Sequence, residues 1–225
     1  MDQDAVTFLG IWQIALLFIT MRAMKIPTFA QAQTYLTEAE NRNPGPWVAH
    51  SARVAEAARA IAVHHSGLDG DAAYILGLLH DIGRREGVTG MRHVYDGYKF
   101  LLNDGYFDAA RIALTHSFPI PNVYAGSSKW DATEDEIQEV QVFLDTHPFD
   151  DYDRLFQLCD SLALPNGFCL IEKRLMDVLM RYKIFNEHTI PKWQTILDIK
   201  RSFDKVIGQN IYSLLPGVVE TTFGF

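Results

Sequence analysis

The sequence predicts an all-α protein of about eight helices, and three observations point to this fold class. After the first two dozen residues, apolar side chains recur three or four positions apart, as they do along one face of a helix. No alternation of apolar and polar residues persists long enough to indicate a β-sheet. Proline, glycine and aspartate stand where the helical patterns begin and end. With 225 residues, 48% of them hydrophobic, the chain is long enough to bury one sizeable core.

Each predicted helix is bounded by such signals. The first covers Thr28–Asn41 and ends in the turn sequence NRNPGP. The second runs from Pro46 to His65, because proline favours the first turn of a helix and Gly67 follows its end. We expect Asp71 to cap the third helix and Gly83 to end it. The remaining predicted helices are residues 92–105, 106–117, 133–144, 151–164, 167–185 and 191–209, and the one clear loop is residues 119–129.

Residues 1–23 differ from the rest of the chain. The run VTFLGIWQIALLFIT is mostly apolar, but the preceding MDQD is acidic where a signal peptide is basic. The run is also shorter than the ~20 residues that a membrane-spanning helix needs. We interpret residues 1–23 as an upstream extension, with a membrane anchor or a partner-binding helix as the alternative. Residues 24–225 then form one helical domain.

The charge and the cysteines of the chain exclude several classes of partner and compartment. The formal charge is −8 and the isoelectric point about 5.4, so no overall positive field attracts a nucleic acid polymer or an anionic membrane. An anionic substrate would need local attraction from a metal ion or a few arginines. Cys159 and Cys169 form no CxxC pair, which favours a cytoplasmic location over a secreted disulfide scaffold.

Four polar residues fall among the apolar residues of these helices. His50 lies on the apolar stripe of its helix, three residues after Trp47. His80 and Asp81 stand at the end of the helix in AYILGLLHDIGRREG, which has almost no polar face. Asp160 lies within the apolar run LFQLCDSLAL. A buried carboxylate without a partner is costly, so it usually shifts its pKa or binds a cation.

Two aspartates and two histidines make a mixed nitrogen and oxygen ligand set, which suits Fe, Mn, Co, Ni or Zn better than Ca or Mg. Neighbouring helical residues point about 100° apart, so His80 and Asp81 can both reach one ion beyond the helix end, or bridge two. Gly83 is expected to open the space for it. Alone, His80 and Asp81 would be better interpreted as a core pair or a helix cap, because a two-residue motif is common by chance. The matching contexts of His50 and Asp160 favour a metal site.

The pattern His50 … His80-Asp81 … Asp160 resembles the HD-domain superfamily of metal-dependent phosphohydrolases, in which HDIG is the commonest spelling of the motif. The similarity covers about Trp47–Tyr182 and includes a region that resembles the final-aspartate helix, and the helix after it, of bacterial HD hydrolases. It implies a single HD-domain helical bundle in which His50, His80, Asp81 and Asp160 bind one metal ion.

Two further histidines, His93 and His116, extend the pattern. Superfamily members with two metals carry additional histidines at similar positions, so the resemblance implies a second ion bound by this pair. The alternatives are one ion with His93 and His116 contacting substrate or transferring protons, or a place for both outside the site. The chain does not match the HD-GYP class, because it has GYK at Gly97–Lys99 and one histidine near position 116.

Arg84 and Arg85 follow the motif directly. A cation in this position can hold a phosphate oxygen or stabilise transition-state charge. The alternative is an exposed pair favoured by the helix dipole. We favour Arg84 for the phosphate, ahead of Arg85 and Arg53. Cys159 has no histidine nearby in sequence to activate it as a nucleophile.

The sequence therefore predicts a phosphohydrolase that cleaves a phosphoester of a nucleotide or related small phosphate with a metal-activated water. Asp81, Arg84, His93 and His116 are its candidate catalytic residues. One alternative is an HD-fold mixed-valence di-iron oxygenase, which shares the six-ligand arrangement. Another is a non-catalytic HD signalling domain, against which the intact ligand residues argue. The oligomeric state is left open, a homo-oligomer included.

Overall fold

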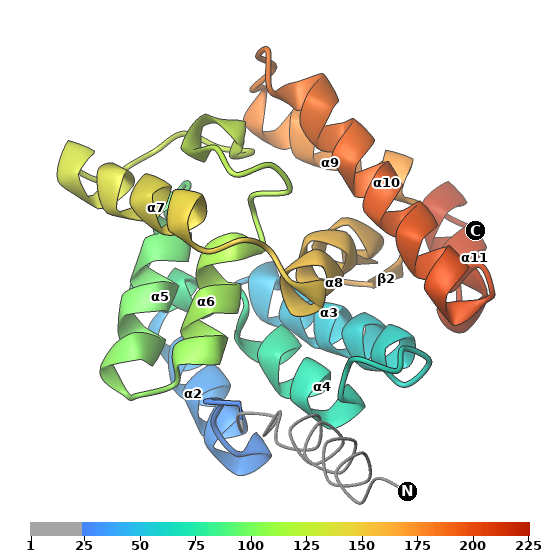
Figure 1. Cartoon of the computed structure of the whole chain (residues 1–225), viewed down its shortest axis with the longest axis horizontal. Helices are drawn as coiled ribbons and strands as arrows, with labels where there is room; N and C mark the ends of the chain where they lie inside the picture. Colours follow the sequence, from blue (N-terminus) through green and yellow to red (C-terminus); the bar gives the residue numbers. More distant parts are fainter. Residues whose placement is uncertain (1–23) are drawn as a thin grey trace, which may run out of the picture.

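The structure, a computed structural model, describes residues 24–225, which contain ten α-helices and one two-stranded hairpin (Figure 1). The all-α fold class is confirmed, and the extension expected at residues 1–23 lies outside the described residues. The helices exceed the expected eight partly because the short α11 forms near the C-terminus. Their bounds are α2 Phe29–Arg42, α3 Pro46–Ala62, α4 Gly70–Leu79, α5 Arg92–Asn103, α6 Phe107–Thr115, α7 Glu134–Thr146, α8 Asp151–Cys159, α9 Ile171–Tyr182, α10 Thr189–Ile207 and α11 Val218–Phe223.

Helices α3 and α4 pack closely against each other in the centre of the molecule (Figure 1). Pro46 occupies the first turn of α3, as expected. The contact requires Gly77, because a β-carbon there would lie 2.4 Å from the Cα atom of Ala55. This close approach brings the inward face of α3, which carries His50, beside the end of α4, which carries His80.

Helix α4 begins earlier than the sequence indicated, so the expected cap is wrong. The side chain of Asp69 accepts a hydrogen bond of 2.8 Å from the amide of Ala72 and caps the helix. Asp71 lies one position inside the helix and pairs with Arg59 at 2.7 Å. Its negative charge still stabilises the positive end of the helix dipole.

Gly83 does not end α4, contrary to the expectation. The helix ends at Leu79, and a 3₁₀ helix over Ile82–Glu86 contains Gly83. The backbone of α5 lies against this turn and leaves no room for a β-carbon. Glycine is therefore required here for close packing, and Gly87, with φ of 135°, ends the turn.

The predicted helix over residues 151–164 is shorter in the structure. Helix α8 ends at Cys159, and a 3₁₀ turn leads into the strand β1, Ala163–Leu164, which pairs with β2, Gly167–Phe168. The residue before a proline avoids the helical conformation, and Pro165 places Leu164 in that position. The hairpin displaces the start of α9 to Ile171 and leaves Asp160 at the end of α8.

The buried apolar residues form one large cluster and one smaller cluster. The large cluster joins α2, α3 and α4 to α8 and α10, and the smaller one surrounds Phe118 and Phe143. Helices α9, α10 and α11 lie together beyond α8, on the opposite side from α5 and α6 (Figure 1). Within residues 24–225, no helix has the length and apolarity needed to cross a membrane.

Candidate metal centre

The structure brings all six predicted ligand residues together from five parts of the chain. His50 comes from α3, His80 and Asp81 follow α4, and His93 lies in the first turn of α5. His116 caps the end of α6, and Asp160 caps the end of α8. The imidazole rings form a row in which the His50–His80, His80–His116 and His116–His93 centroids are 5.3, 4.9 and 5.6 Å apart.

Hydrogen bonds to the backbone fix the orientation of three of these rings. The Nδ1 atom of His80 donates to the carbonyl of Gly77 at 2.8 Å, and that of His93 donates to Gly90 at 2.6 Å. The Nδ1 atom of His116 lies 3.1 Å from the carbonyl of Ala113. Because these carbonyls can only accept, the proton of each ring lies on Nδ1, and Nε2 carries a lone pair. This tautomer is the one in which Nε2 binds a metal ion.

These Nε2 atoms converge on the carboxylate of Asp81. Its Oδ1 atom lies 3.2 Å from Nε2 of His93 and 3.6 Å from Nε2 of His116. Since neither nitrogen carries a proton, Oδ1 receives no hydrogen bond from them. The Nε2 atom of His93 accepts from Nη2 of Arg84 at 3.4 Å, whereas Nε2 of His80 and Oδ1 of Asp81 are buried without a hydrogen-bond partner. A buried carboxylate oxygen surrounded by lone pairs is costly without a cation. The donor set therefore fits a divalent metal ion.

The electrostatics of the site keep its ligands ready for metal binding. Burial lowers the pKa of His80 to about 4 and, together with the charge of Arg84, that of His93 to about 3. Burial acts to raise the pKa of Asp81, but the charge of Arg84 opposes it, and the pKa lies well below its ordinary value. At neutral pH both rings are neutral and Asp81 is ionised, as coordination requires.

Asp160 is held by residues on both of its sides. Its Oδ1 atom lies 2.8 Å from Nε2 of His50 and 3.3 Å from Nη2 of Arg174. Arg174 also donates from Nε to the backbone carbonyl of Asp160 at 3.1 Å. Burial acts to raise the pKa of Asp160, but His50 and Arg174 lower it well below its ordinary value.

Two overlapping groups of ligand atoms are close enough to hold an ion. His50, His80 and Asp160 form one group, and His80, Asp81 and His116 form the other. His80 belongs to both groups, so the geometry suits either one ion near His80 or two neighbouring ions. His93 is in neither group, although it approaches Asp81.

The three candidate arginines occupy different environments. Arg84 donates from Nε to Oδ2 of Asp81 at 2.7 Å, and its other nitrogens face the site. Arg85 points away and stacks over the ring of Phe100 at 4.0 Å. Arg53 pairs with Glu56 at 2.6 Å and lies outside the cavity that contains the site. Of these three, only Arg84 lies where a phosphate group could meet it.

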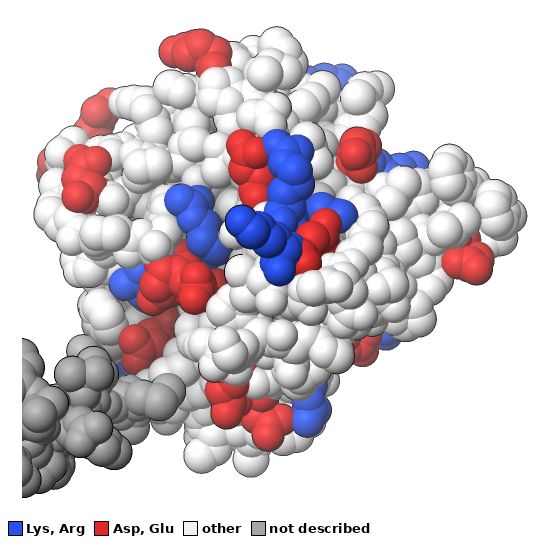
Figure 2. Space-filling model, turned by 45° about the vertical axis from the view of Figure 1, so that its right-hand side comes forward, with Lys and Arg blue, Asp and Glu red and all other residues white. Residues whose placement is uncertain are grey.

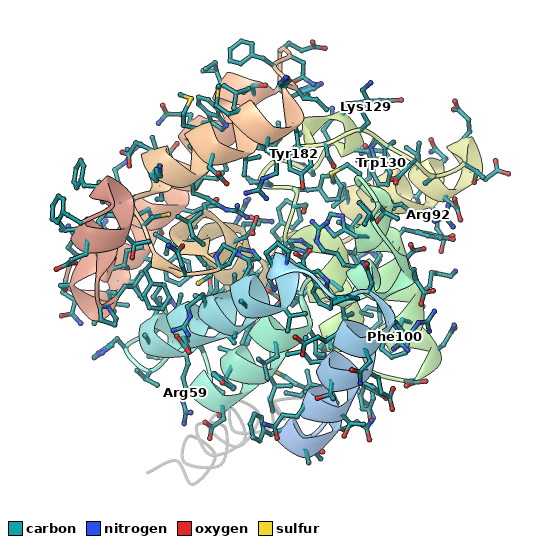
Figure 3. The ribbon with its side chains drawn as sticks, turned by 180° about the vertical axis from the view of Figure 1, so that it is seen from behind. Arg59, Arg92, Phe100, Lys129, Trp130 and Tyr182 are labelled. Atoms are coloured by element: carbon teal, nitrogen blue, oxygen red, sulfur yellow. The ribbon has the colours of Figure 1, made fainter. Side chains whose placement is uncertain are left out.

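The site opens into a cavity of about 620 Å³. Four basic residues line it, Arg84, Arg174, Arg181 and Lys192, and Figure 2 shows basic side chains gathered beside acidic ones in the middle of one face. In Figure 3, Tyr182 lies where the end of α9 approaches the segment that carries Lys129 and Trp130. The volume is within the range of small-molecule sites.

Arg174 and Lys192 were not predicted from the sequence, although a signal for each was present. Arg174 follows Ile171 at the spacing of one helix face, and Lys192 lies between Thr189 and Ile196 on the buried stripe of α10. A basic residue on an apolar face indicates either a buried ion pair or a binding site. Cys159 is buried, which raises the pKa of its thiol well above the ordinary value and agrees with its exclusion as a nucleophile.

Comparison with known proteins adds one finding. The family model of the HD domain matches residues 47–164, more than half of the chain, and all six candidate ligands lie within this range. A search of curated proteins and a search of solved structures found no match. Arg174, Tyr182 and Lys192 lie beyond the matched range.

Proposed function

The chain belongs to the HD domain family, and we propose on this premise that it is a metal-dependent phosphohydrolase. Its substrate is a phosphoester of a nucleotide or a related small phosphate, and its cofactor is one or two ions of Fe, Mn, Co, Ni or Zn. The observation that carries the proposal is the buried, unpartnered pair of His80 Nε2 and Asp81 Oδ1 beside the other imidazoles. When bound, the metal would lower the pKa of a water molecule to about 7 and neutralise charge on the phosphate.

The chain contributes binding, orientation and proton transfer. His50, His80, Asp81 and Asp160 hold the ion, each fixed by packing or by hydrogen bonds. His93 and His116 approach Asp81 and either bind a second ion or transfer protons.

Arg84 is the residue that binds the phosphate group of the substrate. Its Nε atom donates to Asp81 and its Nη2 atom contacts Nε2 of His93 at 3.4 Å, which leaves the remaining N–H groups for a phosphate oxygen in the cavity. The pair with Asp81 raises the pKa of Arg84 against the effect of burial, so the guanidinium stays charged. The unpaired, buried Cys159 and Cys169 support the expected cytoplasmic environment.

The test combines metal analysis with a panel of phosphomonoesters, phosphodiesters and dinucleoside polyphosphates. We expect the purified protein to contain one or two transition-metal ions per chain and to hydrolyse at least one member of the panel. The variant Asp81→Ala should lose both the metal and the activity, and His116→Ala should lose one ion of two if the site is dinuclear. Exposed His64 is far from any ligand role, so His64→Ala serves as the matched control.

Three results would contradict the proposal. Full metal occupancy and activity in Asp81→Ala would refute the assignment of Asp81 as a metal ligand. Metal-loaded protein without activity on the panel would favour a non-catalytic domain. Two irons per chain with a product that requires O₂ would establish the oxygenase alternative instead. Measuring the reaction with and without O₂ separates these chemistries.

A further inference from the structure

Lys192 lies on α10, outside the range matched by the HD domain family, and its side chain lines the same cavity as the candidate metal centre. Its exposed fraction is only 7%. Lysine is rarely buried to this extent unless a partner neutralises its charge. The group that neutralises the charge of Lys192 therefore bears on the function of the cavity.

Two neutral groups hold the ammonium in place. The Nζ atom donates to the carbonyl of Ala125 at 2.8 Å and to the hydroxyl of Ser127 at 2.9 Å. An ammonium has three N–H donors, so one remains after these two bonds. Both anchors lie on the loop that faces α10 across the cavity rim, and they fix the direction of the remaining donor.

Lys192 differs from the other basic residues of the cavity in having no carboxylate partner. Arg84 pairs with Asp81, Arg174 with Asp160, and Arg181 with Asp177. Within residues 24–225, no carboxylate lies within ion-pair distance of Lys192. Burial accordingly lowers its pKa to about 8, and the charge of Asp160 only partly opposes this shift.

The cavity as a whole carries positive charge although the chain is acidic. Its lining contains four basic residues and two carboxylates, Asp81 and Asp160, which give a net charge of +2 before any metal ion is counted. The chain as a whole has a formal charge of −8. A positive cavity in an acidic protein attracts small anions selectively, and a dianion gains more than a monoanion.

We propose that Lys192 binds an oxygen of the substrate's phosphate and that the preferred substrates are phosphomonoesters, whose terminal phosphate is a dianion, over phosphodiesters. This inference rests on the proposed hydrolase function. The phosphate supplies the negative charge that no neighbouring carboxylate of the described residues provides, while Ala125 and Ser127 hold the ammonium in position. The residue thus adds substrate recognition from a part of the chain outside the matched domain.

The first test measures the affinity of metal-loaded protein for inorganic phosphate by calorimetry, together with KM and kcat on the best phosphomonoester. Lys192→Gln should weaken phosphate binding and raise KM about tenfold or more, the usual effect of losing a charged hydrogen bond, with a smaller change in kcat. Lys192→Arg should restore most of the affinity. Lys200→Gln is the matched control, because Lys200 lies on the same helix and pairs with Asp204.

A second pair of variants keeps the lysine and so tests the proposal even if Lys192→Gln does not fold. Ser127→Asp places a carboxylate beside Nζ and should weaken phosphate binding more than Ser128→Asp, which adds the same charge to the same cavity without bonding Lys192. Equal phosphate affinity in the wild type and folded Lys192→Gln, or equal effects of the two aspartates, would overturn the inference.

The binding measurement separates this inference from the proposed function, because it requires no turnover. Hydrolysis by the wild type with no effect of the Lys192 variants on phosphate affinity would contradict the role of Lys192 alone. Phosphate binding that depends on Lys192, without hydrolysis of any phosphoester, would contradict the proposed function. A preference for phosphodiesters in the wild type would overturn the substrate class.

Discussion

Gly83 lies directly against the backbone of His93, so that a β-carbon at Gly83 would stand 1.9 Å from the His93 carbonyl oxygen. The same atom would lie 2.4 Å from the amide nitrogen of Gly97. This contact sets the distance between the HDIG turn and α5, and therefore the position of the His93 ring relative to Asp81. The glycine of the motif thus acts through packing between two parts of the site.

Gly83→Ala is expected to force α5 away from the HDIG turn. The overpacking should lower the free energy of unfolding by about 1–3 kcal/mol and move His93 away from Asp81. Urea denaturation and metal analysis measure the two effects. Gly67→Ala is the control, since its new β-carbon would meet only movable side-chain atoms, of His65 at 3.3 Å and of Asp151 at 3.6 Å. Unchanged stability and metal content in Gly83→Ala would show that α5 is not fixed by this contact.

Arg174→Gln is expected to weaken metal binding about 10- to 100-fold, as loss of a residue that orients a metal ligand usually does. The substitution removes the bonds from Arg174 to the carbonyl and the carboxylate of Asp160. Competition with a chelator of known affinity measures the change. Arg181→Gln is the matched control, because Arg181 shares the Asp177 partner of Arg174 but does not bond Asp160. Equal metal affinity in the two variants would refute the orienting role.

Arg84 and Arg85 are adjacent, yet their substitutions should have different effects. Arg84→Gln is expected to lower kcat/KM at least tenfold, because it removes a cation from the cavity beside Asp81. Arg85→Gln should lower stability by about 1 kcal/mol through loss of the contact with Phe100, with kcat/KM nearly unchanged. Steady-state kinetics and thermal denaturation of both variants distinguish the roles. A larger kinetic defect in Arg85→Gln would reverse the assignment.

The stability of the metal-stripped protein should fall as the pH is lowered from 6.5. The folded-state pKa values of His80 and His93, about 4 and about 3, lie below the 6.5 of an unfolded histidine. The unfolded chain therefore binds more protons in this range, and each ring costs about 2 kcal/mol between pH 6.5 and 5. Asp81 and Asp160, with lowered pKa values, keep their contribution until the pH falls below the ordinary 3.8.

Urea denaturation of chelator-treated protein between pH 7.5 and about 5 measures this slope. His93→Gln should reduce the slope, because it removes one of the two rings whose pKa burial lowers. A stability that does not change over this interval would mean that the two rings take up protons in the folded state as readily as in the unfolded chain.

The sequence by itself predicted the helical class and the residues of the candidate site. Helical periodicity placed His50 on an inward face, and the apolar run before His80 indicated its burial. Asp160, expected to be buried in the same way, keeps 30% of its side chain exposed because it faces the cavity. Both signals are local, because they depend only on which residues stand three or four positions apart. For the same reason the boundaries were less accurate, and the hairpin after α8 was missed.

Only the tertiary structure decided how these residues face one another. The pairing of Arg174 with Asp160 and the isolation of Lys192 from carboxylates depend on atoms distant in sequence. The close approach of Gly83 to α5 is likewise a contact between two separate elements, invisible in a pattern of apolar spacing. Local spacing determines which side of a helix is buried, whereas the packing of helices against one another determines which side chains meet there.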